Sequence, residues 1–218
     1  ISGVFGILNG TCNYILTEMH SAAVAGQNQN FDDVLKTAQK LGYAEADPST
    51  DIDGIDAAHK LALLSSLSFG TVVDFDSISV EGIRYVSSVD IEYAVELGYV
   101  IKLLAVACKT STGIEQRVQP SMVSVKTPIA HVNGVSNAVV VHSDFCGETI
   151  YQGPGAGEGA TASAVASDIV DIARGHRIPT FAVPAKNLEP IETNSALATS
   201  AAYYVRLMVL DKPGVIAD

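Results

Sequence analysis

The residues best suited to chemistry lie in one acidic stretch, residues 41–60. It holds five carboxylates and ends in a single lysine: Glu45, Asp47, Asp51, Asp53, Asp56 and Lys60. Lys60 is the only Lys or Arg between Lys40 and Arg84. An ammonium beside several carboxylates can bind a polar substrate and move a proton on a carbonyl or an alcohol. The stretch is therefore the first candidate for an active site.

A calcium loop is one reading of this stretch, because residues 51–54 read Asp-Ile-Asp-Gly, as in the middle of an EF-hand loop. That register places Ser49 at the first ligand position and Lys60 where a bidentate Glu should close the loop. A cation at the closing position excludes calcium. We expect no metal site here.

A structural reading remains open. Asp53 would cap a helix, Asp56 would lie near the positive end of its dipole, and Asp56 would pair with Lys60. Such a pair contributes about 0.2–0.5 kcal/mol on an exposed helix. Against this reading, apolar residues cover nearly the whole circumference of the helix that follows: Ala57, Ala58, Leu61, Ala62, Leu63, Leu64 and Leu67. That pattern predicts a buried helix and a desolvated Lys60, which favours acid–base chemistry.

The second polar turn is Asn9-Gly10-Thr11. Five apolar residues around it predict a buried helix entered through this turn: Ile7, Leu8, Ile15, Leu16 and Met19. The turn can be a simple N-terminal cap, or its N–H groups can receive a polar group of a substrate. Both interpretations stay open at Gly10 and Thr11.

The third notable stretch is the glycine-rich segment 153–157, which joins a predicted strand to a helix ending near Arg174. Its Gly-x-Gly-x-Gly spacing differs from Gly-x-Gly-x-x-Gly, and no βαβ unit surrounds it. A Rossmann phosphate loop is therefore not expected, and a tight strand–helix turn is the structural alternative. Asn30 is expected to cap a helix at 31–41, and Gly42 ends that helix as a C-terminal cap.

The remaining pattern predicts the fold class. A helix is expected at 90–97, and β-branched residues dominate after Tyr99. Strands are expected at these ranges: 77–83, 100–108, 114–125, 138–142 and 149–152. We predict an α+β fold with a mostly antiparallel or mixed sheet and helices packed on one face.

Composition limits the function. The chain has 218 residues, of which 48% are hydrophobic, and a net charge of −11. That charge argues against nucleic acid and anionic membranes as partners, and the sequence has no apolar run of transmembrane length. Three widely spaced cysteines (Cys12, Cys108, Cys146) are typical of buried thiols in a reducing, cytoplasmic protein. The sequence begins without Met, so we expect a piece of a longer protein.

Residues 42–60 resemble the signature of homoserine dehydrogenases, Gly-aromatic-x-Glu-x-Asp-Pro-x-x-Asp-hydrophobic-x-Gly-x-Asp-x-x-x-Lys, and every element of it is present. The run Gly-Ile-Leu-Asn-Gly-Thr-x-Asn-Tyr-Ile-Leu at 6–16 is similar to the same family. So is the glycine-rich loop followed by Thr-Ala-Ser-Ala-Val at 161–165. The resemblance covers essentially the whole chain.

The resemblance implies a role for each matching residue. Lys60 would be the catalytic acid and base. The substrate-binding residues would be Glu45, Asp56, Asp51, Gly10 and Thr11. The residues against the cofactor would be Gly42, Gly155 and Gly157. NADP or NAD would be bound mainly by an N-terminal Rossmann domain that is absent from this chain.

The resemblance also implies the organisation. Residues 1–190 would be a catalytic and dimerisation domain, and 191–202 a linker. Residues 203–218 would be the truncated start of an ACT regulatory domain, with its first strand from Tyr203 and the Asp-x-Pro-Gly-Val signature at 211–215. The implied enzyme is a homodimer that interconverts L-homoserine and L-aspartate 4-semialdehyde in threonine, methionine and isoleucine biosynthesis. The isolated chain would be inactive.

The alternative is a non-catalytic dimerisation and amino-acid-sensing fragment. A Gly-x-Gly-x-x-Gly unit upstream of Ile1 would favour the enzyme.

Overall fold

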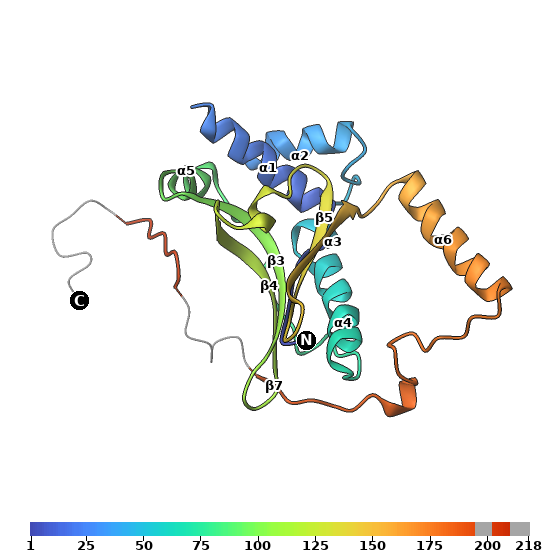
Figure 1. Ribbon diagram of the computed structural model, residues 1–218. Helices are drawn as coiled ribbons and strands as arrows, with labels where there is room; N and C mark the ends of the chain where they lie inside the picture. The colour runs from blue at the N-terminus through green and yellow to red at the C-terminus, as the bar shows by residue number, and fades with distance from the viewer. Residues whose placement is uncertain (195–201, 210–218) are drawn as a thin grey trace.

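The computed structural model describes residues 1–194 and 202–209, and a single twisted sheet lies at its centre (Figure 1). The strands are β1 (Gly3–Ile7), β2 (Ser79–Val80), β3 (Tyr99–Lys109), β4 (Ile114–Ser124), β5 (Ser136–Ser143), β6 (Gly147–Pro154) and β7 (Thr193–Asn194). Their order is β2-β4-β3-β1-β5-β6, and β7 also pairs with β4. The five long strands pair antiparallel, whereas β2 and β7 run parallel to β4. The predicted mostly antiparallel, mixed sheet is confirmed.

The helices are α1 (Gly10–Val24), α2 (Phe31–Lys40), α3 (Ser49–Ile52), α4 (Ile55–Phe69), α5 (Ser88–Glu96) and α6 (Glu158–Ala173), with short 3₁₀ turns at Pro128–His131 and Ala185–Asn187. Helices α1, α4 and α5 contact the sheet (Figure 1). Side-chain caps fix two helix starts as predicted: Asn30 accepts from Asp33 N at 2.9 Å, and Asn9 accepts from Cys12 N at 2.8 Å. The α+β class is confirmed.

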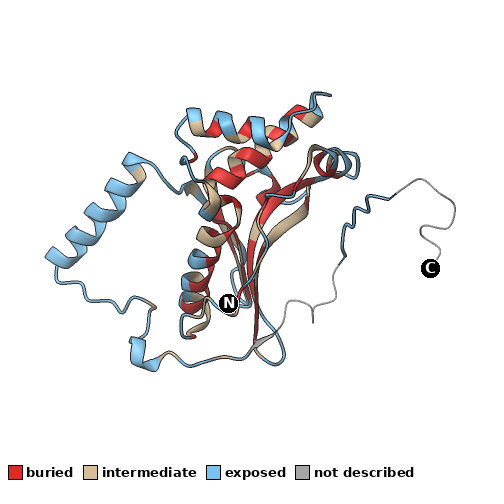
Figure 2. Cartoon of the chain, turned by 180° about the vertical axis from the view of Figure 1, so that it is seen from behind, coloured by how far each residue is buried: buried red, intermediate tan, exposed pale blue. Residues whose placement is uncertain are grey.

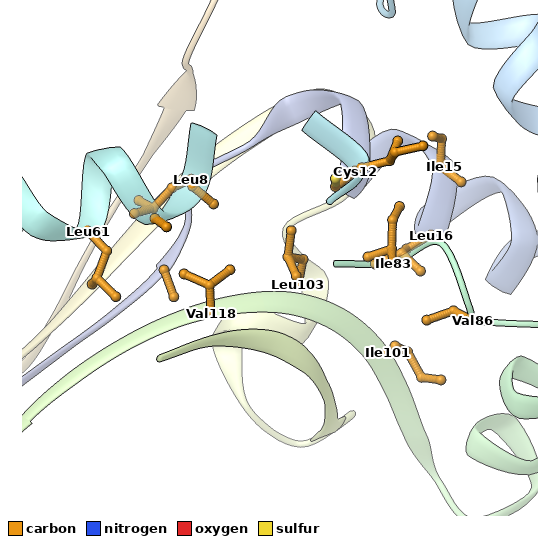
Figure 3. Close-up of a cluster of buried hydrophobic side chains, with 14 of the residues drawn as sticks. Leu8, Cys12, Ile15, Leu16, Leu61, Ile83, Val86, Ile101, Leu103 and Val118 are labelled. Carbon is orange, nitrogen blue, oxygen red and sulfur yellow. The ribbon is translucent and has the colours of Figure 1, made fainter. Parts of the chain in front are cut away.

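The main core lies between the sheet and these helices (Figure 3). Leu8 and Cys12 enter it from the junction of β1 and α1, Leu61 from α4, and Leu103 from β3. All four are at most 7% exposed. The junction and α4, which carry the two main polar motifs, are therefore anchored in the same core.

The opposite face of the sheet carries a smaller apolar cluster. It is formed by Ile7, Val100, Val123, Ile129, Ala130, Val132, Ala138 and Val140, with Phe5 and Leu104 packed against it. Apolar side chains thus lie on both faces of β1, β3 and β5, because each of these strands contributes residues to both clusters.

Several local predictions were wrong. Ile7 ends a strand instead of lying in a helix, because the chain pairs with both β3 and β5 before it reaches Asn9. Helix α4 is buried on one side only, and Leu63 and Leu67 are each 52% exposed. Cys146 is exposed in the turn between β5 and β6.

The C-terminal part also differs from expectation. Residues 202–209 form no helix or strand, so the strand expected from Tyr203 does not form within them. Tyr204 and Arg206 instead contact Asp90 of α5, at 3.0 and 3.3 Å. The signature at 211–215 lies outside the described residues.

Helix α6 extends away from the sheet, and all of its residues but one are exposed (Figure 2). It begins after the glycine-rich loop and ends at Ala173, close to the predicted end. None of the described helices is long and apolar enough to cross a membrane.

Candidate functional site

The junction between β1 and α1 forms one wall of the candidate site. Asn9 uses its whole side-chain amide: its oxygen caps α1 through Cys12 N, and its Nδ2 donates to two carboxylates. The acceptors are Asp51 Oδ1 at 2.8 Å and Asp56 Oδ2 at 2.9 Å. Asn9 is 6% exposed, so its orientation is set by packing as well as by these bonds. One residue therefore couples the helix cap to the acidic stretch.

The acidic stretch folds into α3 and α4, which meet at Gly54. Gly54 has φ 83°, a left-handed conformation that favours glycine, and α4 begins at the next residue. Asp53 is therefore not the predicted N-cap. It receives two hydrogen bonds from Arg84, both 2.8 Å, outside the cluster around Asn9. The turn at Gly54 places Asp51 and Asp56 beside Asn9, whereas Asp53 faces Arg84.

Lys60 reaches back from the second turn of α4 to the same place. Its Nζ lies 2.7 Å from Asp56 Oδ2 and donates to the Leu8 carbonyl oxygen at 3.1 Å. The Lys60 side chain is 48% exposed and that of Asp56 is 28% exposed. The predicted Asp56–Lys60 pair is present, but the prediction of a desolvated Lys60 was wrong, because α4 buries only its opposite side. The ammonium is held in place and is open to a ligand.

Asp51 has a different environment from Asp56. Its Oδ2 lies 3.1 Å from Thr11 Oγ1, which also donates to the Tyr43 carbonyl oxygen at 2.7 Å. A hydroxyl has one proton, so Thr11 can donate to only one of them at a time. Among the described residues, the Asp51 carboxylate is held by neutral donors, Asn9 and Thr11, and by no cation. It is the carboxylate of the cluster best placed to attract a positively charged group.

The Cys12 thiol lies beneath Asp51 and does not act as a nucleophile. Its Sγ donates to the Asp51 carbonyl oxygen at 3.1 Å. Burial, and then the charges of Asp51, Asp56 and Asp53, raise the pKa of this thiol well above its ordinary value. The sulfur therefore stays protonated and supports the backbone of α3.

Two predicted site residues do not join this cluster. Glu45 is exposed after α2, and its backbone carbonyl accepts a hydrogen bond from Gln39 Nε2 at 3.0 Å. No hydrogen bond to its carboxylate occurs within the described part of the chain. Gly42 follows α2 with φ 76° and has open space where a side chain would begin. The structure shows its role in ending the helix.

The glycine-rich loop approaches the junction through Asn137 of β5. A Cβ on Gly155 would lie 2.4 Å from Asn137 Cγ, and a Cβ on Gly10 would lie 3.5 Å from Asn137 Oδ1. Both glycines thus pack against one side chain. A Cβ on Gly155 would force Asn137 to move, and a Cβ on Gly10 would also lie 2.8 Å from the Val135 carbonyl oxygen. Gly157, with φ 101°, has open space around it at the start of α6.

Sequence reasoning missed the two groups that tie the site together, the Asn9 amide and the Leu8 carbonyl. Asn9 could have been noticed, because an Asn at a helix cap beside Gly10 and Thr11 still has an amide nitrogen to donate. The Leu8 carbonyl carries no signal in the sequence. No group of three or more His, Cys, Asp or Glu residues arranged to hold a metal ion occurs among residues 1–194 and 202–209.

Comparison with known proteins extends the resemblance. The family model for homoserine dehydrogenase matches residues 1–170. A homoserine dehydrogenase of Neisseria gonorrhoeae is 47% identical over 229 aligned residues, covering 100% of this chain and 50% of that protein. One from Pseudomonas aeruginosa is 45% identical over 224 residues, again covering 100% of this chain and 50% of the relative.

Solved structures agree. The crystal structure of a homoserine dehydrogenase from Thiobacillus denitrificans is 46% identical, with a TM-score of 0.83 over 89% of this chain and 46% of that one. A hyperthermophilic archaeal homoserine dehydrogenase mutant in complex with NADPH is 32% identical, with a TM-score of 0.65 over 83% of this chain and 49% of that one. The chain spans about half the length of the curated relatives it matches. It belongs to the homoserine dehydrogenase family.

Proposed function

We propose that the full-length protein catalyses the reversible, NAD(P)-dependent interconversion of L-homoserine and L-aspartate 4-semialdehyde. The observation that carries this proposal is the position of Lys60, whose ammonium is fixed between Asp56 and the Leu8 carbonyl and still half-exposed. An oriented proton donor at an open acidic site suits the reduction of an aldehyde to an alcohol.

Lys60 holds and moves the proton in this proposal. In the direction of reduction, its Nζ donates a proton to the aldehyde oxygen as that oxygen becomes an alcohol. In oxidation the same nitrogen, when neutral, takes the hydroxyl proton. Asp56 and the Leu8 carbonyl fix the direction of the side chain, so that the nitrogen meets the substrate oxygen in one geometry.

The carboxylates bind the amino group of the substrate. Asp51 is the strongest candidate, because its partners Asn9 and Thr11 are neutral donors. Asp56 adds negative charge but is already paired with Lys60. Glu45, which the family resemblance places at the substrate, is exposed after α2 and would complete the site from outside the cluster.

The cofactor would be NADP or NAD, since one archaeal relative was solved in complex with NADPH. When bound, it supplies the hydride donor or acceptor. Gly155 lies against Asn137 and Gly157 has open space, so this loop fits the close approach of a flat ring, and Gly42 is proposed as a further contact. Phosphate binding would need another domain. We therefore expect the 218-residue chain alone to bind NADP too weakly for calorimetry, and micromolar affinity would contradict this.

Substrate analogues test the proposal in the full-length protein. We expect L-homoserine to drive reduction of NADP or NAD. 4-Hydroxybutyrate lacks the amino group, so its kcat/KM should be roughly tenfold to a hundredfold below that of L-homoserine through loss of a charge-assisted contact. D-Homoserine is the control for geometry. Absence of any homoserine-dependent turnover would refute the enzyme and favour a dimerisation and amino-acid-sensing role.

We propose that the protein is a homodimer and that the face of the sheet with the smaller apolar cluster is its interface. An apolar groove on this face is lined by Phe5, Leu104, Val123, Ile129 and Val140, together with polar residues at its edge. An apolar sheet face needs a partner, and a second copy offers a matching surface. Sedimentation velocity should show a dimer at micromolar concentration, and a stable monomer would contradict this.

The remaining roles are proposals from the family resemblance. They are a cytoplasmic location, a place in threonine and methionine biosynthesis, and an ACT regulatory domain beginning at 203. The net charge of −11 supports the expectation that neither nucleic acid nor a membrane is a partner.

A further inference from the structure

A second lysine, Lys102 of β3, is fully buried behind the site. Its Nζ donates to the Val132 carbonyl oxygen at 2.6 Å, to Asn13 Oδ1 at 3.0 Å and to Asn133 Oδ1 at 3.2 Å. These acceptors are neutral, and no carboxylate pairs with Lys102 in the described ranges 1–194 and 202–209. Three acceptors match the three protons of an ammonium. A buried ammonium with three hydrogen-bond acceptors needs an explanation beyond packing.

The strand register explains where Lys102 lies. β1 runs between β3 and β5, and its last pairs are Gly6 with Ala105 and Ile7 with Ala138. Lys102 lies beyond those pairs, where β1 has ended and the chain has entered α1. The side chain therefore occupies the gap between β3 and β5 that β1 no longer fills, beside the loop at 132–136.

Asn13 of α1 joins this loop to the helix. Its Nδ2 donates to the carbonyl oxygens of Val132 and Ser136, both at 3.0 Å, while its Oδ1 accepts from Lys102. One turn later, Thr17 Oγ1 accepts from Gly134 N at 3.2 Å. The helix, the loop and β3 thus share one hydrogen-bonded network.

The same turn of α1 carries the site on its other side. Asn13 follows Asn9 by one helical turn, and Asn9 and Thr11 hold Asp51. Between them, a Cβ on Gly10 would lie 2.8 Å from the Val135 carbonyl oxygen, so the loop touches the backbone of this turn. Any shift of the loop at 132–136 would therefore move Asn9 and Thr11.

We propose that Lys102 is a positioning residue, whose ammonium fixes the first turn of α1 against the loop at 132–136 and thereby holds Asn9 and Thr11 in the geometry that binds the amino group of the substrate. This inference rests on the proposed function. Lys102 does not touch the substrate itself, because its side chain is fully buried. An apolar residue could fill the same space, but it would not fix the distance between three separate elements.

Kinetics of the full-length protein provide the first test. In Lys102→Met, which removes the ammonium and keeps the length of the side chain, we expect KM for homoserine to rise roughly tenfold or more. We expect KM for NADP to stay within about twofold, because the proposed cofactor contacts lie at Gly42 and in the glycine-rich loop, and none lies in the first turn of α1. Lys40→Met, at an exposed lysine on α2, is the control and should behave like wild type.

Amide hydrogen exchange provides the second test and needs no activity. In Lys102→Met, exchange should accelerate at residues 9–13 and 132–136 and stay near wild type in α4 and the outer strands. If the wild-type protein turns over no homoserine, the proposed enzyme fails while this measurement still decides the role of Lys102. Acceleration throughout the chain would show a merely structural lysine and overturn the proposal.

A milder variant covers the case in which Lys102→Met does not fold. Asn133 is exposed, so Asn133→Ala removes one of the three acceptors without opening the core. This variant should show the same two effects with smaller magnitude. KM for homoserine should rise, and amide exchange at residues 9–13 should be faster. An unchanged KM in an active enzyme, or unchanged exchange in that segment, would overturn the positioning role.

Discussion

The first turn of α1 separates two regions, each with one lysine, and the two lysines differ in burial and in the charge of their partners. On the outer side, Lys60 is 48% exposed and faces Asp56, a charge of opposite sign. On the inner side, Lys102 is fully buried and contacts only neutral oxygens among the described residues. Lys60 remains accessible to water and to a ligand, whereas the ammonium of Lys102 is hydrogen-bonded to protein oxygens and is shielded from solvent.

This difference assigns different work to the two lysines. A half-exposed ion pair contributes little to stability, because solvent screens it. The fixed direction of Lys60 Nζ towards Asp56 and the Leu8 carbonyl oxygen therefore suits a chemical role. A buried ammonium is costly to desolvate and cannot reach a substrate. It can act only through the elements it joins. Variants at each lysine and at the residues between them can separate the two roles.

Lys60→Ala in the full-length protein should lower kcat by on the order of 10²–10⁴, the loss typical of a general acid or base. The protein should stay folded, because an exposed pair contributes little to stability. Steady-state kinetics and circular dichroism measure the two effects, with Lys40→Ala as the matched control. A variant that kept more than about a tenth of wild-type kcat would reduce Lys60 to half of a surface pair.

Lys102 should make stability depend on pH in the alkaline range. Burial lowers the pKa of Lys102 from 10.5 to about 8 in the folded protein. Between these values the unfolded chain binds a proton that the folded chain has lost. The free energy of unfolding should therefore rise with pH, by about 1.4 kcal/mol per pH unit, relative to Lys102→Met.

Urea denaturation at pH 8 to 10 measures this difference. Below about pH 8 the two proteins should show parallel pH dependence, since Lys102 is then charged in both states. His20 of α1 also senses this charge: burial first, and then Lys102, lower its pKa. Parallel curves throughout the alkaline range would mean that burial does not destabilise the Lys102 ammonium.

Asn9 tests how the two regions are joined, through a pair of variants. Asn9→Ala removes the cap and both donors, and should cost about 1 kcal/mol of stability for the cap and raise KM for homoserine. Asn9→Ser keeps a cap oxygen and loses the donors to Asp51 and Asp56. It should keep most of the stability and share the raised KM. A normal KM in Asn9→Ser would show that Asn9 acts only as a cap.

Arg84→Ala should have the smallest effect. The Arg84–Asp53 pair is exposed on both sides, 44% and 41%, and lies outside the cluster at Asn9. We expect unchanged kcat and KM and a slight fall in melting temperature. The hydrogen bond from Arg84 lowers the pKa of Asp53, so the difference from wild type should be present at neutral pH and vanish as the pH falls through that pKa. A clear loss of activity would mean that Asp53 belongs to the site.

The fold was largely predictable, because its long strands and capped helices follow local rules. Alternating β-branched residues marked β3 and β4 to within one residue, and Asn30 marked the start of α2. β1 was missed, since a short run with two glycines and apolar residues on both faces carries no helix or strand period. Its strand character comes from two neighbours far along the chain.

The site was predictable in part. The match to the family signature indicated Lys60, Asp51 and Asp56, and the structure brings these three together with Thr11. The roles that the family resemblance implies remain predictions for all of these residues, and Glu45 and Gly42 lie outside the cluster. Lys102 gave no signal, because a lysine in an apolar strand reads as an edge residue, and only the register of β1 reveals the space it fills.

The central position of β1 has a consequence for how the molecule forms. Gly3 pairs with Cys108 on one side and with His142 on the other, so the first strand of this chain to be synthesised must wait for segments made much later. Such distant pairings close large loops and slow folding. The stretch with Asp51, Asp56 and Lys60 lies inside the first of these loops. The arrangement of these three side chains should therefore be completed only after the last partner of β1 has left the ribosome.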